Sequence, residues 1–84
     1  MVSLEQEFLE DCMVLADTTQ ELFGPHPSIE FGACRIAEEA GELVQALTSV
    51  SRHRKGWTYE QRKVAVKAEA MDTVAMVLRA LREL

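Results

Sequence analysis

The 84-residue sequence has few of the residues that build disulfide-rich or redox-active domains. It contains two cysteines, Cys12 and Cys34, and no Cys-x-x-Cys pair. This argues against a disulfide framework and against a cysteine-based zinc or redox site. Each cysteine lies within an apolar helical pattern, so we interpret both as buried, reduced thiols.

Long apolar runs and early basic residues are also missing. No segment approaches the roughly 20 apolar residues of a membrane span. Residues 1–10 hold acids and no signal-peptide-like apolar run. We therefore expect a cytoplasmic protein with no membrane partner.

Basic residues are scarce in the first part of the chain. Residues 1–50 hold ten acidic residues and only one basic residue, Arg35, whereas residues 51–84 hold four acidic and eight basic ones. The net charge is −5, which argues against a general nucleic-acid binder. The uneven distribution leaves room for a local basic patch in the second part.

Both prolines, Pro25 and Pro27, fall in one short stretch with Gly24, and this stretch is predicted to end the first helix. The rest of the chain is compatible with long helices. Apolar residues there recur at three- and four-residue steps, and no β-hairpin signal is present. The helical patterns cover residues 8–23, 29–47 and 64–84.

Capping residues indicate where these helices begin. Ser3 and Gln6 have the spacing of a capping box, and so do Thr58 and Gln61. Ser28 is the predicted N-cap of the middle helix. The middle pattern fades over residues 49–51, and a polar, basic connector is predicted to follow it.

The third helix has more apolar surface than two neighbours in the same chain are expected to cover. A domain this short seldom gains more than about 3–5 kcal/mol from its own core. We therefore expect residues 1–84 to form a single all-α domain. Its three main helices would form a four-helix-bundle-type core completed by oligomerisation, as a homodimer or homotetramer. The alternative is that its own two neighbours clasp the third helix.

Acidic residues recur at helical spacing on the second and third helices. Glu38, Glu39 and Glu42 lie within one sector of the second helix, and Glu69 and Asp72 stand three residues apart on the third. Two such pairs on adjacent helices can converge on one point. Four hard oxygen donors suit Mg²⁺, with Mn²⁺ as the alternative ion.

The simpler interpretation of these acids is a solvated helix face. Glu69 and Asp72, however, stand among apolar neighbours, where a carboxylate is costly without a partner. The partner is then either a metal ion or a basic side chain, with Lys67 and Arg35 as the candidates.

The run from Arg35 to Leu43, with Glu38-Glu39-x-x-Glu42, resembles the K-L-x-E-E-x-G-E-L run of the MazG-like all-α nucleoside triphosphate pyrophosphohydrolase superfamily. Glu69-x-x-Asp72 on the next helix is similar to the superfamily's second acidic motif. The His-Pro segment at residues 23–27 also resembles one found there. The resemblance covers roughly residues 22–84.

The resemblance implies hydrolysis between the α- and β-phosphates of a nucleoside triphosphate, giving a monophosphate and pyrophosphate with Mg²⁺. House-cleaning of noncanonical or surplus (d)NTPs is the implied role. Glu39, Glu42, Glu69 and Asp72 match the superfamily's metal ligands. Glu38 matches a catalytic carboxylate that takes a second metal or orients the attacking water.

Basic and aromatic residues near the connector are the candidate substrate contacts. Arg54 and Lys55, with Arg52, are placed to meet the outer phosphates, and the ring of Trp57 or of Tyr59 to stack on a base. The alternative is a solvated loop with Trp57 packed on the core. Arg35 and Arg79 fall on the carboxylate faces, where each either contacts phosphate or pairs with a carboxylate.

Two other functions stay open at this point. A phosphoribosyl-ATP pyrophosphohydrolase-like enzyme keeps the same superfamily and changes the substrate. A helical interaction module without catalysis uses the same helices and gives the carboxylates no chemical role.

Overall fold

The computed structural model describes residues 3–52 and 56–84, and for residues 49–52 it describes the backbone alone. Over these residues it consists of three helices and no strand: α1 (Leu4–Phe23), α2 (Ile29–Arg52) and α3 (Tyr59–Arg82). The prediction of an all-α fold is confirmed. No helix in this part of the chain combines the length and apolarity that crossing a bilayer requires.

The predicted helix starts are confirmed by side-chain hydrogen bonds. The Ser3 hydroxyl accepts from the Gln6 backbone N–H at 3.1 Å, and Gln6 Oε1 accepts from the Ser3 N–H at 3.0 Å. Thr58 and Gln61 repeat this exchange at 3.0 and 2.9 Å. The Ser28 hydroxyl accepts from the backbone N–H three residues on, at 3.0 Å. Each cap satisfies a donor that the first helical turn leaves unpaired.

The loop between α1 and α2 is attached to the far end of α3. Gly24 ends α1 with a φ of +73°, a conformation that favours glycine. Its carbonyl accepts a hydrogen bond at 2.8 Å from Nη2 of the buried Arg79. The His26 backbone N–H donates to Glu83 Oε1 at 3.2 Å. These contacts hold the ends of α1 and α2 against the last turns of α3.

The middle helix is longer than its apolar pattern indicates. The predicted end after residues 49–51 agrees with the structure to within one residue, because α2 continues to Arg52. Once a helix is formed, each further residue adds a backbone hydrogen bond whether or not its side chain is apolar. The basic connector is correspondingly shorter, and its residues 53–55 lie outside the described part of the chain.

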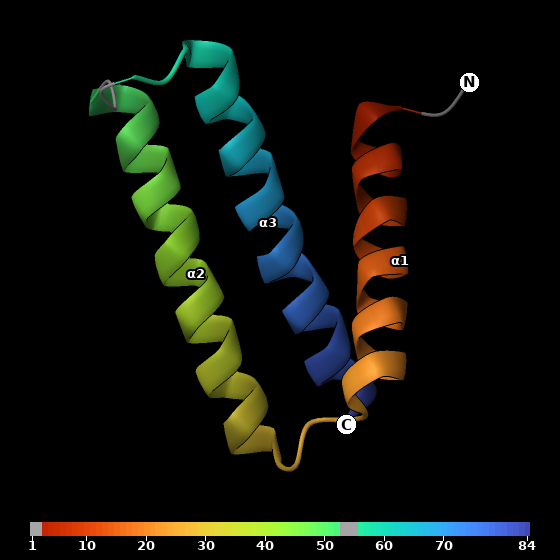
Figure 1. Cartoon of the computed structure of the whole chain (residues 1–84). Coiled ribbons are helices and arrows are strands. Elements are labelled where there is room, and N and C mark those ends of the chain that lie inside the picture. Colours follow the sequence, from red (N-terminus) through yellow and green to blue (C-terminus); the bar gives the residue numbers. More distant parts are fainter. Residues whose placement is uncertain (1–2, 53–55) are drawn as a thin grey trace.

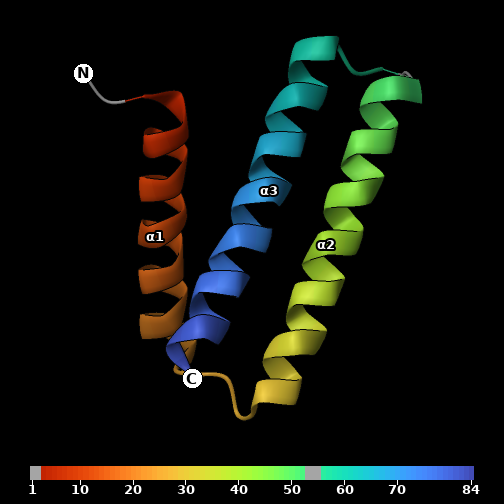
Figure 2. The same ribbon diagram turned by 180° about the vertical axis from the view of Figure 1, so that it is seen from behind.

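Helix α3 lies between the other two helices, as Figures 1 and 2 show from opposite sides. It runs parallel to α1 and antiparallel to α2, and it packs against both. The fully buried apolar residues are small, with Cys12 and Ala16 on α1 and Ala75 on α3. Small side chains let the backbones of α1 and α3 approach closely where they cross.

The expectation for the two cysteines holds for only one of them. Cys12 is buried at the packed face of α1, whereas Cys34 is exposed. Cys34 stands five residues before the buried Glu39. At about 100° per residue it therefore lies about 140° round the helix from the packed face. The apolar residues near Cys34 in the sequence form a stripe on α2 that is wider than the surface covered by α3.

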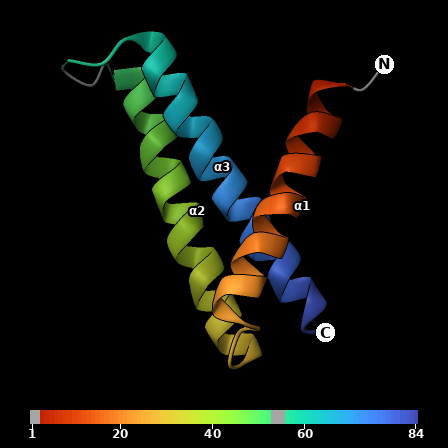
Figure 3. The same cartoon turned by 45° about the vertical axis from the view of Figure 1, so that its right-hand side comes forward.

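The three helices form an open layer. The molecule measures 40 × 35 × 18 Å, and its radius of gyration is 14.2 Å. A compact chain of this length has a radius of about 12 Å. Figure 3 shows the reason, since α1 crosses α3 near their C-terminal ends and diverges from it toward the N-terminal ends. Among the residues whose side chains are described, sixteen large apolar ones remain exposed, so a single copy does not enclose a four-helix core.

Candidate metal centre

An acidic cluster lies between the middles of α2 and α3. Because the two helices are antiparallel and of equal length, their central residues face each other. One carboxylate oxygen from each of Glu39, Glu69 and Asp72 lies within 4.8 Å of the other two. The structure thus brings together three of the four carboxylates predicted as metal ligands. Their role as ligands stays a prediction.

The cluster is largely removed from water. Glu39 is 9% exposed, and Glu69 and Asp72 are half-buried. Oε2 of Glu69 is buried with no hydrogen-bond partner among the described residues. A buried carboxylate oxygen without a partner costs free energy. A bound cation is the kind of partner that would remove this cost.

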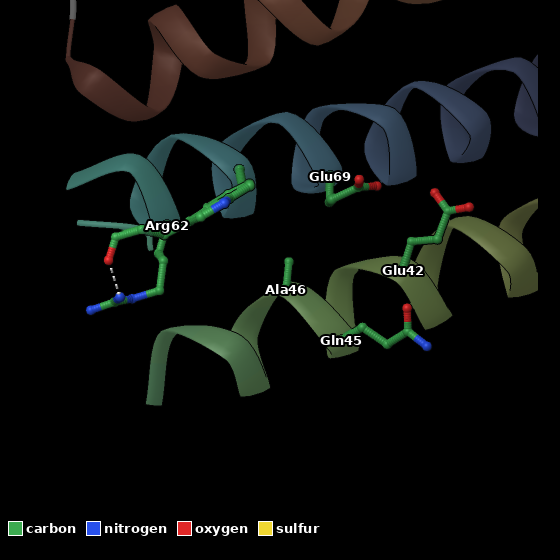
Figure 4. Close-up of a pocket in the computed structure, with 7 residues that line it drawn as sticks. Glu42, Gln45, Ala46, Arg62 and Glu69 are labelled. Carbon is green, nitrogen blue, oxygen red and sulfur yellow. Dashed lines mark hydrogen bonds between the residues drawn. The ribbon is translucent and has the colours of Figure 1, made fainter. Parts of the chain in front are cut away.

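Glu42, the fourth predicted ligand, lies at the rim of the cluster. It is exposed on α2, and Figure 4 shows its carboxylate reaching toward Glu69 on α3. It is close enough to act on all three clustered carboxyls.

The ionisation of the cluster reflects crowding of like charges. Burial raises the pKa of Glu39, the charge of Glu42 raises it further, and Arg35 opposes these effects. Burial also raises the pKa of Glu69, followed by hydrogen bonding with Glu42. For Asp72, burial and then the charge of Glu42 raise the pKa. A divalent cation would reverse these effects, because it favours the ionised form of every carboxylate beside it.

Glu38 and Arg35 lie on the outer side of the cluster. Glu38 is exposed, and its Oε2 accepts from Arg35 Nη1 at 2.6 Å. Arg35 Nη2 donates to Glu39 Oε1 at 3.0 Å. Of the two roles predicted for Arg35, the structure shows the pairing with carboxylates. The arginine partly offsets the charge of Glu39 and holds its side chain in place.

A hollow of about 190 Å³ opens beside Glu42 and Glu69 toward the connector. Trp57 lines it and is 42% exposed. Arg62 lines it too and donates from Nη1 to the Trp57 carbonyl at 2.7 Å, the dashed bond in Figure 4. The sequence analysis did not single out Arg62, which is 4% exposed. Its position seven residues before Glu69, on the same helix face, is the signal that marks it.

A second hollow of about 460 Å³ lies at the opposite end of the cluster, under the α1–α2 loop. Arg35, Phe31, Met76 and Arg79 line it. Arg79 was predicted to contact phosphate or pair with a carboxylate. Its Nη2 instead donates a hydrogen bond to the Gly24 carbonyl. Any contact of Arg79 with a substrate would have to use the rest of its guanidinium.

Of the other predicted contacts, Arg54, Lys55 and the side chain of Arg52 lie outside the described part of the chain. The structure therefore places the acidic cluster between two hollows. One is bordered by an indole ring and Arg62, and the other by Arg35 and Arg79.

We expect the clustered carboxyls to lower the stability of the metal-free protein as the pH rises. The clustered carboxyls have pKa values raised above the ordinary 4.5 for Glu and 3.8 for Asp. The folded state therefore binds more protons than the unfolded state between the ordinary and raised values, so the stabilisation present at low pH is lost through that window. Denaturant unfolding in EDTA from pH 4 to pH 8 measures this fall.

The matched variant for this prediction is Glu69→Gln, which removes one of the clustered charges. Its stability should fall less with pH than that of the wild type, because fewer carboxyls must ionise at the same place. Equal slopes in the two proteins would contradict the electrostatic description of the cluster.

Comparison of the chain with known protein families, curated proteins and solved structures gives no match.

Proposed function

We propose that this protein is a metal-dependent hydrolase of phosphoanhydrides. The observation that carries the proposal is the group of three carboxylates from two helices, with oxygens within 4.8 Å of one another and one buried oxygen left without a partner. More specifically, we propose a Mg²⁺-dependent nucleoside triphosphate pyrophosphohydrolase that acts on noncanonical or surplus (d)NTPs.

The donors fit a hard divalent ion. Carboxylate oxygens are what Mg²⁺ and Mn²⁺ prefer, and both ions keep coordination positions for water and phosphate. Glu39, Glu69 and Asp72 would hold the ion, with Glu42 as the fourth carboxylate. Such an ion supplies charge neutralisation of the phosphates and activation of water.

The chain's own residues would position the substrate around this centre. Glu38 lies beside the cluster and accepts a hydrogen bond from Arg35, and we propose that it orients the attacking water. The Trp57 ring is the candidate surface for stacking a base. Arg35 and Arg79, together with Arg54 and Lys55, are the candidate partners of the phosphates.

We further propose that the whole chain is a single domain that acts in the cytoplasm as a homodimer or homotetramer. The open layer of helices and the exposed apolar side chains support self-association, because a core this small gives little stability to one copy. A free nucleotide is the proposed substrate, and the net charge of −5 argues against binding nucleic acid or an anionic membrane.

Release of pyrophosphate from a panel of NTPs and dNTPs with Mg²⁺, compared with phosphoribosyl-ATP, tests the proposal. We expect turnover of at least one nucleoside triphosphate, with monophosphate and pyrophosphate as products. Preferential turnover of phosphoribosyl-ATP would favour the second enzyme. No turnover of any substrate by protein shown to bind Mg²⁺ would leave the interaction module as the function.

A further inference from the structure

Helices α1 and α3 diverge along their N-terminal halves (Figure 3), and we call the angle between them the wedge. We define its walls by Leu4 and Phe8 on α1 and by Val64 and Ala68 on α3. We propose that this wedge receives α1 of a second copy of the chain, while the second copy's wedge receives α1 of the first. The interface is then the same surface on both copies, as two-fold symmetry requires.

The walls are extensions of the faces on which α1 and α3 already pack. Phe8 and Leu4 stand one and two turns before Cys12, which is buried against α3. Val64 and Ala68 precede the buried Ala75 at helical spacing, and Val64 is 69% exposed. An apolar groove runs along α3 past these two residues to Trp57. The helices therefore present their packing faces where they have separated from each other.

The surface that one copy exposes in excess of a compact monomer is large enough for a stable dimer interface. The chain has an accessible surface of 6116 Å². A compact monomer of 9.4 kDa exposes about 5,000 Å², so each copy has about 1,100 Å² in excess. A stable interface buries about 800 Å² on each partner. The excess surface of each copy is therefore large enough to supply an interface of this size.

Two lysines on this half of α3, one of which also pairs with Glu60 at 3.6 Å, favour the acidic α1 of a second copy as the occupant. Helix α1 carries six acidic residues and no basic one. Beside the apolar strip on α3 stand Lys63 and Lys67, each within a turn of Val64. The chain's own α1 diverges from this half of α3. An α1 from a second copy would place its acids against these lysines.

The interface would also border the candidate substrate hollow. Trp57 lines the groove beside Val64 and also the hollow beside Glu42 and Glu69. A partner helix in the wedge would pack against the groove that Trp57 lines. The dimer contact and the candidate site would therefore share this residue.

Sedimentation of Val64→Asp against Val44→Asp tests the surface. Both valines are exposed, at 69% and 61%, but Val44 lies on α2, outside the two walls of the wedge. We expect the wild type to be a dimer or a dimer of dimers. Val64→Asp should weaken this association by about 100-fold or more, because a carboxylate is costly in a dry interface. Val44→Asp should leave it unchanged. Circular dichroism checks that both variants keep the wild-type helix content.

Zero-length carboxylate–amine cross-linking of mixed light and heavy isotope-labelled chains tests the occupant. We expect mixed-isotope peptides that join Lys63 or Lys67 to acids of α1. A monomeric wild type would overturn the proposal, as would equal association of the two valine variants. Cross-links from these lysines to any other helix of the second copy, or none between copies, would also overturn it. These readouts do not depend on catalysis, so their failure is distinct from failure of the proposed hydrolase activity.

Discussion

Asp72→Asn is expected to lower nucleotide turnover by about 100-fold or more. The variant keeps the shape of the side chain and removes one of three charges that would hold the ion. Neutralisation of phosphate by a metal is worth several kcal/mol, and each 1.4 kcal/mol, approximately, is a factor of ten in rate. Steady-state pyrophosphate release at fixed Mg²⁺ measures the effect. Glu39→Gln should behave in the same way.

The control for this prediction is Asp17→Asn on α1. Asp17 pairs with Arg82 at 2.7 Å on the surface, far along the chain from the cluster, and such exposed pairs contribute at most about 1 kcal/mol. Its loss should leave turnover near the wild-type value. If Asp72→Asn were as active as Asp17→Asn, the carboxylates would have no catalytic role, as the interaction-module alternative requires.

Saturating Mg²⁺ is expected to raise the melting temperature by about 10–20 °C. An ion that binds only the folded state, at 100 times its dissociation constant, stabilises it by about 2.7 kcal/mol. Each kcal/mol shifts the melting temperature of a domain this size by about 4–8 °C. The ion would also relieve the repulsion among Glu39, Glu69 and Asp72. Thermal unfolding at fixed protein concentration, with Mg²⁺ or with EDTA, measures the shift.

Glu69→Gln should separate the two contributions to this shift, which are selective binding of the ion to the folded state and relief of the repulsion among the carboxylates. Without metal the variant should be more stable than the wild type, because one crowded charge is gone. With Mg²⁺ it should gain little, because an amide is a weaker ligand than a carboxylate. A Mg²⁺ shift as large as that of the wild type would place the ion elsewhere on the molecule.

The caps and the periodicity were sufficient to predict the helices. Ser3, Ser28 and Thr58 start them through contacts within four residues, which sequence spacing determines directly. The sequence was also sufficient to predict that the acidic residues of α2 and α3 face each other. Two helices joined by a short connector pack antiparallel, so motifs near their middles meet.

The divergence of α1 could not be predicted from periodicity. Where two helices touch depends on side-chain size across the contact, and the small Ala16 and Ala75 allow close approach at one end only. Periodicity also did not predict that Cys34 is exposed, because the apolar stripe of a helix can be wider than the surface that the neighbouring helix covers. The hydrogen bond from Arg79 to the Gly24 carbonyl joins residues 55 positions apart. The spacing of residues within one helix cannot predict such a contact.

A crystal structure of the protein with bound Mn²⁺, located by its anomalous scattering, tests the central claim most directly. We predict one ion in contact with carboxylate oxygens of Glu39 and of Glu69 or Asp72, so that it joins α2 and α3. The claim would be contradicted by Mn²⁺ bound only at other residues, or by a cluster without Mn²⁺ in crystals of protein that turns over nucleotide under the same conditions.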